Sequence, residues 1–233
     1  MRQLLPHPAE EVDPAEVYRR DRPPRPDRPW VVANMIASAD GAATVAGRSG
    51  GLGGTAARKV FHLLRASVDV VLAAAETVRV ERYRPILESR PVPLAVVSRS
   101  LSLDWTSPLF TDAPARTILL TCEAADGAAR RRAAAVADVV VVGDEAVEPR
   151  LALAALAERG HRVALCEGGP DLLAQLVDAR VVDELCLTVS PLLVGGTGPR
   201  ILMGGEATGP VPLVLDSALE DDGFLLLRYL AER

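Results

Sequence analysis

Short apolar runs are spaced along most of this sequence and are separated by amphipathic stretches. Six of the runs are almost continuously apolar, which is typical of strands buried on both faces of a mostly parallel sheet. They lie at Trp30–Met35, Val68–Ala73, Leu94–Ser98, Thr117–Thr121, Val139–Val142 and Arg162–Cys166. The pattern therefore predicts a central sheet whose strands are mostly parallel.

Helical patterns occupy the gaps between these runs. Within Thr55–Ala66, apolar residues recur at the i, i+3, i+4, i+7 spacing of one helix face, and charged residues line another face. Pro149 and Pro170 each open a further helix, because the fixed φ of proline suits the first helical position. The alternation of strands and helices is typical of an α/β protein.

The C-terminal part of the chain has a different pattern. Three apolar segments follow one another without helices between them, which predicts antiparallel strands. They are Glu184–Val189, Val211–Ser217 and Phe224–Leu230. We expect residues 30–233 to form one three-layer α/β/α domain, with a mostly parallel central sheet and an antiparallel C-terminal edge.

Residues 1–29 lack both periodicities. Seven of the 18 prolines lie between Pro6 and Pro29, among many charged residues. Proline fixes φ and removes a backbone donor, so we expect an extended arm rather than a core element. The pattern leaves open whether this arm packs on the domain or on a partner subunit.

The composition narrows the classes of function. The chain has 233 residues, of which 49% are hydrophobic, and its net charge of −5 argues against a general nucleic-acid binder. No apolar run approaches the roughly 20 residues that span a bilayer, and the N-terminus lacks the apolar segment of a signal peptide. We therefore expect a cytoplasmic protein that binds neither nucleic acid nor membrane.

The cysteines and histidines give no metal-binding pattern. Cys122, Cys166 and Cys186 lie in apolar stretches without a CxxC pair, and no histidine lies near a cysteine in metal-ligand spacing. Reduced, buried thiols and no metal site are the expectation.

The segment Cys166–Leu172 carries the most informative turn. A buried strand ends at Glu167, two glycines follow, and Pro170 then opens a helix. Glycines let a ligand approach the backbone, and the free N–H groups of a helix N-terminus attract an anion such as a dinucleotide phosphate. The GxGxxG fingerprint is absent, so a tight structural turn with a solvated Glu167 is an equal alternative.

A second candidate region follows the first predicted strand. Ser38-Ala39-Asp40-Gly41 forms a turn there, and the glycine-rich stretch 47–55 after it could wrap a ligand and offer the Ser49 hydroxyl. The alternative is a surface loop in which Thr55 is a helix N-cap.

A third candidate region lies at Ala75–Pro85. Thr77 and Glu81 are four residues apart and share a face if this segment is a short helix. Three arginines could converge on one anionic group, although each alone is more typical of a protein surface. They are Arg65, Arg82 and Arg84.

Five short motifs follow one another from about Trp30 onward. They are Ser38-Ala39-Asp40-Gly41, Leu63-Leu64-Arg65-Ala66, Glu76-Thr77-Val78, Glu167-Gly168-Gly169-Pro170, and Val182-Asp183-Glu184-Leu185 with Ser190-Pro191. In this order and spacing they resemble the S-L-D-G, L-L-R-A, G-T-V, E-G-G-P and V-D-E-L…P of the reductase domain of riboflavin biosynthesis, the C-terminal half of the bifunctional deaminase–reductases.

The resemblance implies a dihydrofolate-reductase-like fold, usually homodimeric, which uses NADPH to reduce the ribose of a pyrimidine 5′-phosphate to a ribityl chain. By position, it assigns cofactor contacts to Ala37, Gly51, Thr77, Glu81, Ser98, Gly168, Gly169, Pro170, Asp171 and Leu172. It assigns substrate contacts to Ser49, Glu167, Arg65 as phosphate partner, and Arg82 or Arg84 in place of a displaced second arginine. The expected catalytic residues are Glu167, as acid–base group for opening the ribosylamine ring, Asn34 and Asp40.

Asn34 is a departure that leaves the substrate open. Many bacterial members carry lysine at this position, whereas archaeal and fungal members that reduce the diamino pyrimidine tend to carry asparagine. The zinc-deaminase signature H-x-E…P-C-x-x-C is absent, so no deaminase activity is expected. Two alternatives remain: a dihydrofolate or other pteridine reductase, with Asp40 or Glu76 pairing with the pterin ring, and a non-catalytic NADPH-binding regulatory protein.

Overall fold

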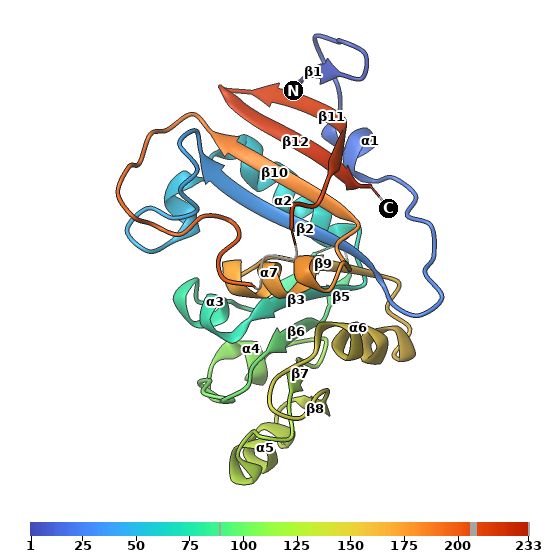
Figure 1. Ribbon diagram of the computed structural model, residues 1–233, viewed down its shortest axis with the longest axis vertical. Coiled ribbons are helices and arrows are strands. Elements are labelled where there is room, and N and C mark those ends of the chain that lie inside the picture. Colours follow the sequence, from blue (N-terminus) through green and yellow to red (C-terminus); the bar gives the residue numbers. More distant parts are fainter. Residues whose placement is uncertain (89, 206–208, 233) are drawn as a thin grey trace.

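A computed structural model describes residues 1–88, 90–205 and 209–232, and its centre is one large sheet with helices on both faces (Figure 1). The strands of this sheet are β1 (Arg2–Leu5), β2 (Trp30–Ser38), β3 (Val70–Ala74), β6 (Leu94–Val97), β7 (Ile118–Thr121), β8 (Asp138–Val141), β9 (Val163–Cys166), β10 (Glu184–Ser190), β11 (Leu213–Asp221) and β12 (Phe224–Ala231). A separate hairpin pairs β4 (Ile86–Leu87) with β5 (Pro91–Val92). The helices are α1 (Pro14–Tyr18), α2 (Thr55–Ala66), α3 (Ala75–Val80), α4 (Pro108–Thr111), α5 (Gly127–Ala134), α6 (Pro149–Glu158) and α7 (Pro170–Asp178), with a 3-10 turn at Ser49–Leu52.

The strand order of the large sheet is β1-β11-β12-β10-β2-β9-β3-β6-β7-β8. The strands from β10 to β8 are parallel, whereas β12 is antiparallel to β10, β11 to β12, and β1 to β11. The expected fold class, a mostly parallel sheet with an antiparallel edge, is therefore confirmed. The parallel strands are almost continuously apolar because both of their faces are covered.

Alternate residues of the central strands face two separate cores. On β3, Val71 and Ala73 pack in the same core as Leu64 of α2. Val70 and Leu72 of that strand pack in the other core, together with leucines of α6 and α7. The two-residue period of the strands thus produces the three layers.

The six apolar runs all form strands whose ends lie within three residues of the expected ones, and α2 begins and ends as expected. The bounds expected for Val211–Ser217 are wrong. β11 continues to Asp221, because its second half pairs with β1 on one side and β12 on the other. β10 also differs from the simple expectation, since it is antiparallel to β12 but parallel to β2.

The N-terminal arm packs on the body of the domain. β1 pairs with β11, and Val17 and Tyr18 of α1 are buried in the core that contains α2. The expectation that the arm contributes no core element is therefore wrong. A helix of five residues is too short to show a period, but Pro14 at its first turn is a start signal that the sequence did offer.

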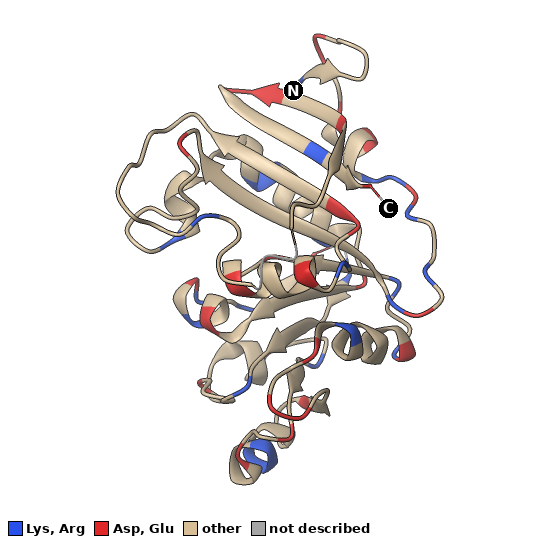
Figure 2. Cartoon of the chain, viewed as in Figure 1, with Lys and Arg blue, Asp and Glu red and all other residues tan. Residues whose placement is uncertain are grey.

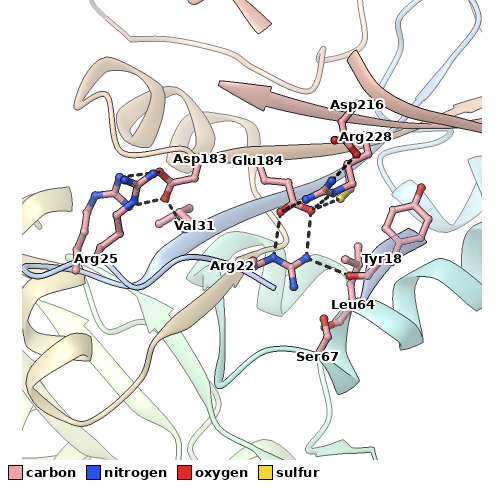
Figure 3. Close-up of polar contacts among 12 residues, drawn as sticks. Tyr18, Arg22, Arg25, Val31, Leu64, Ser67, Asp183, Glu184, Asp216 and Arg228 are labelled. Atoms are coloured by element: carbon pink, nitrogen blue, oxygen red, sulfur yellow. Dashed lines mark hydrogen bonds and ion pairs between the residues drawn. The ribbon is translucent and has the colours of Figure 1, made fainter. Parts of the chain in front are cut away.

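Arginines of the arm pair with two buried carboxylates at the start of β10. Figure 2 shows basic residues along the segment between α1 and β2, and Figure 3 shows their guanidinium groups directed at Asp183 and Glu184. A fourth arginine reaches Glu184 from β12. The pairs are Arg25–Asp183, Arg28–Asp183, Arg22–Glu184 and Arg228–Glu184. The V-D-E-L motif is thus the anchor of the arm.

Candidate active site

A cavity of about 580 Å³ opens where neighbouring parallel strands end. Its lining includes Asn34 on β2, Thr188 on β10, Ala74 at the end of β3 and Glu167 directly after β9. These four strands are adjacent in the sheet (Figure 1). The carboxyl ends of parallel strands are where α/β proteins present functional groups, so this cavity is the candidate active site.

Glu167 is held by two side chains that converge on its carboxylate. Arg65 of α2 donates from Nε to Oε1 and from Nη2 to Oε2, both at 2.7 Å. The Tyr83 hydroxyl donates to Oε2, also at 2.7 Å. The side chains of Arg65 and Glu167 are 14% and 3% exposed, so the pair is nearly shielded from water.

Two aromatic rings complete this cluster. The Arg65 guanidinium lies 4.1 Å from the ring centre of Phe61 and 5.5 Å from that of Tyr83, within the range of cation–π contacts. Burial and the charge of Glu167 raise the pKa of Tyr83 well above its usual value, so its phenol stays protonated and remains a donor at neutral pH. Burial lowers the pKa of Arg65, but the hydrogen bonds with Glu167 and the negative charge of that carboxylate together outweigh burial and raise it overall.

The Gly168–Gly169 turn brings backbone to the cavity wall. Gly168 has a φ of +92°, a conformation that favours glycine, and its carbonyl accepts a hydrogen bond from the Ala74 N–H at 2.8 Å. A Cβ on Gly169 would lie 2.9 Å from Thr77 Oγ1. Gly169 is also the N-cap of α7 and offers no side-chain cap, so the first N–H groups of that helix are available to a ligand.

A hydrogen bond ties the glycine-rich loop to the residue that caps the C-terminus of α3. The Ser49 N–H donates to Glu81 Oε1 at 2.8 Å, and both residues line the cavity. Gly51 lies two residues after Ser49, and a Cβ added to it would meet Val45 Cβ at 2.9 Å. Glu81 therefore fixes the loop that forms one wall of the cavity.

Asp40 lies past the end of β2, where it anchors a loop. The Ser38 hydroxyl donates to its Oδ1 at 2.5 Å, and the N–H groups of Val194 and Gly195 donate at 3.1 and 2.7 Å. These hydrogen bonds, that of Ser38 first, lower the pKa of Asp40 to about 2. Asp40 thus joins the β2 turn to the loop after β10.

The cavity brings together ten of the residues expected at the site. They are Asn34, Ser49, Thr77, Glu81, Glu167, Gly168, Gly169, Pro170, Asp171 and Leu172. The other expected residues are not part of its lining: Ala37, Asp40, Gly51, Arg65, Arg82, Arg84 and Ser98. Arg65 still reaches the site through Glu167, whereas Arg82 and Arg84 are exposed and the Ser98 hydroxyl accepts a hydrogen bond from the Leu101 N–H.

The cavity lining includes several residues that were not expected from the sequence, and three of them are charged or aromatic. Arg58, Phe61 and Tyr83 all line the cavity. A usable signal existed, because Arg58, Phe61 and Arg65 recur at the i, i+3, i+7 spacing of one helix face. Phe61 and Tyr83 are also conspicuous in a chain with only 3% aromatic residues.

Two classes of feature are absent from the part of the chain that the structure describes. No group of three or more His, Cys, Asp and Glu residues there could hold a metal ion. No helix within residues 1–88, 90–205 and 209–232 has the length and apolar character needed to cross a membrane.

Comparisons with known proteins show which family the chain is similar to. The RibD C-terminal domain family matches residues 29–222. The 2,5-diamino-6-ribosylamino-4(3H)-pyrimidinone 5′-phosphate reductase of Aquifex aeolicus is 34% identical over 191 residues, which cover 77% of this chain and 84% of that protein. The enzyme of the same name from Archaeoglobus fulgidus is 28% identical over 194 residues, which cover 77% of this chain and 88% of that protein.

Solved structures give the same fold. A pyrimidine reductase-like protein from Corynebacterium diphtheriae superposes with a TM-score of 0.81 at 26% identity, covering 89% of this chain and 93% of that one. A dihydrofolate reductase from Enterococcus faecalis superposes with a TM-score of 0.51 at 13% identity, covering 88% of this chain and 97% of that one, and that similarity concerns the fold alone.

Proposed function

This chain belongs to the RibD C-terminal domain family, and from that premise we propose that it is an NADPH-dependent reductase of 2,5-diamino-6-ribosylamino-4(3H)-pyrimidinone 5′-phosphate in riboflavin biosynthesis. The observation that carries the proposal is the shared cavity of Glu167 and the Gly168–Gly169 turn. The Glu167 carboxylate suits acid–base chemistry, and the glycine turn suits the binding of a dinucleotide. The family relatives with the diamino name cover most of this chain and match most of their own length.

The residues around the glycine turn fit a nicotinamide dinucleotide. Gly168 and Gly169 have no side chains that would keep a ligand away from the backbone. A Cβ at Gly169 would lie only 2.9 Å from Thr77 Oγ1. The uncapped N-terminus of α7 offers N–H groups to a phosphate. We assign cofactor binding to this turn, Thr77 and the first residues of α7; NADPH supplies the hydride when it is bound there.

Glu167 is assigned to move a proton on the substrate. Opening the ribosylamine ring breaks the C1′–O4′ bond, places a proton on O4′ and removes one from the exocyclic nitrogen. A carboxylate can carry this proton from one atom to the other. Arg65 and Tyr83 fix both Glu167 oxygens at 2.7 Å, so the carboxylate keeps one orientation while it acts.

Asn34 supports the choice of the diamino pyrimidine. It lines the cavity from β2, and its side-chain amide has both a donor and an acceptor, which a 2-amino-4-oxo pyrimidine edge can satisfy together. Lysine, the residue of many bacterial members, is a donor only. We therefore assign Asn34 to recognition of the pyrimidine ring.

A homodimer is also part of the proposal. Leu213, Val214 and Leu215 on β11 and Leu225 on β12 are exposed by 37–46%. β1 pairs only with Ala218–Glu220, so it leaves the first half of β11 as a sheet edge. An exposed apolar edge strand favours pairing with a second copy. Light scattering during size exclusion measures this directly: twice the chain mass supports the dimer, and the monomer mass at micromolar concentration contradicts it.

The test of the function follows NADPH oxidation with three candidate substrates. We expect turnover with the diamino pyrimidine phosphate, slower turnover with its deaminated form, and none with dihydrofolate. Turnover with dihydrofolate alone would make the protein a pteridine reductase. NADPH binding without oxidation of NADPH by any of the three would make it a regulatory protein.

A further inference from the structure

We propose that Arg58 binds the 5′-phosphate of the substrate and so determines the preference of this site for phosphorylated pyrimidines. The inference rests on the proposed function and deepens it. Arg58 lies in the first turns of α2, and its side chain lines the cavity. It matched no expected site position in the sequence.

The charges around the cavity carry the first step. Arg58 is the one cationic side chain of the described residues in its lining. Four carboxylates line the same space: Glu76, Glu81, Glu167 and Asp171. A phosphate dianion near these groups would be repelled unless a cation paired with it, and arginine matches phosphate oxygens with its planar fork of donors.

The other candidate arginines either pair with a carboxylate or lie outside the cavity lining. Arg65 donates from Nε and Nη2 to Glu167 at 2.7 Å, so a phosphate there would compete with a nearly buried carboxylate. Arg82 and Arg84 are exposed, as Arg58 is, but neither of them lines the cavity. Arg58, by contrast, has no ion pair or hydrogen-bond partner for its side chain among the described residues. Its guanidinium is available to a ligand.

The geometry of α2 sets the distance between the reacting end of the substrate at Glu167 and its 5′-phosphate at Arg58. Arg58, Phe61 and Arg65 lie on one face of α2, and seven residues of helix separate the first α-carbon from the last by about 10 Å. Glu167 lies beside Arg65 at one end of this face. A pentose that reacts at Glu167 can extend over Phe61, so that its 5′-phosphate reaches Arg58 at the other end.

The experiment compares the wild-type protein with Arg58→Gln and with Lys59→Gln as a matched control. Lys59 is the next residue of the helix, is exposed, and does not line the cavity. Steady-state kinetics use the phosphorylated diamino pyrimidine and its dephosphorylated nucleoside, and binding of NADPH and NADH is measured separately. The loss of one charge-assisted contact should raise the KM for the phosphorylated substrate at least about 10-fold in Arg58→Gln.

The nucleoside KM and the affinity for both dinucleotides should stay unchanged in Arg58→Gln, and Lys59→Gln should match the wild type. An unchanged KM for the phosphorylated substrate overturns the proposal. So does a loss of NADPH affinity without a loss of NADH affinity, because the 2′-phosphate of the cofactor would then be the partner of Arg58.

A second measurement keeps this inference separate from the proposed function. Ribose 5-phosphate should raise the Tm of the wild-type protein and of Lys59→Gln, but not that of Arg58→Gln, even if no pyrimidine is turned over. In that case the phosphate site stands and the assigned reaction fails. Equal stabilisation of the wild type and Arg58→Gln by ribose 5-phosphate, or stabilisation of neither, refutes the phosphate site.

Discussion

Replacing Arg22 with methionine should destabilise the whole domain, although Arg22 lies in the proline-rich arm. Arg22 donates from Nε and Nη2 to Glu184 at 3.0 and 3.1 Å, and the two side chains are 3% and 0% exposed. Arg228 donates to the same carboxylate at 2.8 and 3.2 Å (Figure 3). Methionine keeps the apolar length of the side chain and removes only the charge and the donors.

The magnitude follows from the burial of the pair. Removing one partner of a buried ion pair costs about 3–5 kcal/mol, because a charge stays buried without compensation. Arg228 still pairs with Glu184 in the variant, so we expect the lower end, about 3 kcal/mol. For a domain of this size the Tm should fall by about 6–12 °C.

Thermal unfolding monitored by circular dichroism, with urea unfolding in parallel, measures this effect. Arg2→Met is the control, because Arg2 lies in the same arm and pairs with Glu220 at 3.3 Å, but its side chain is 50% exposed. That surface pair should be worth less than about 1 kcal/mol. A decrease in Tm for Arg22→Met no larger than that for Arg2→Met would refute the reasoning, since burial would then add nothing to the stabilisation by the ion pair.

Three further predictions concern the site. Glu167→Gln should lower kcat about 100-fold or more, the size of a lost acid–base group, with an unchanged dissociation constant for NADPH, and normal turnover would leave Glu167 a structural acid. Gly169→Ala places a Cβ 2.9 Å from Thr77 Oγ1 and should raise the KM for NADPH, and the double variant with Thr77→Ala should raise it by less than the two single effects combined. Ser38→Ala should raise the pKa of Asp40 from about 2 towards its ordinary value, as read by NMR titration. A lowered carboxylate pKa stabilises the folded state above the ordinary pKa, and this stabilisation is lost as the pH falls through the lowered value. Ser38→Ala should therefore lose more stability relative to the wild type at neutral pH than near pH 2, where the loss of the hydrogen bond that the Ala42 N–H donates to the Ser38 hydroxyl remains.

The parts of the fold that depend on local pattern could be predicted from the sequence. Buried strands and α2 carry strong periodicities, and the turn after β9 follows from two glycines and Pro170. The arm could not be predicted in the same way. Its arginines and the carboxylates of Asp183 and Glu184 lie more than 150 residues apart, and no local spacing reports a pair of this kind.

The candidate site, like the fold, could be predicted only where its residues lie close together in the sequence. The turn at Glu167 was found because its residues are consecutive, and Thr77 was found through a short motif. The contact between Arg65 and Glu167 depends on how α2 packs over the sheet, and both residues therefore seemed free to act on a ligand. Once they are paired, the cavity has a different balance of charge, and a phosphate partner must be sought elsewhere on the helix.

The anchor of the arm and the site chemistry lie at opposite ends of the same strands. Asp183 and Glu184 lie at the start of β10, and Thr188 of that strand lines the cavity near its end. β2 likewise begins just after Arg28, which pairs with Asp183, and carries Asn34 further along. Ion pairs at the start of both strands can hold them in register without contacting a ligand. The loss of Arg22 should therefore lower the Tm and leave kcat and KM nearly unchanged at temperatures where the variant is folded. A large change in KM there would mean that the arm also positions the cavity wall.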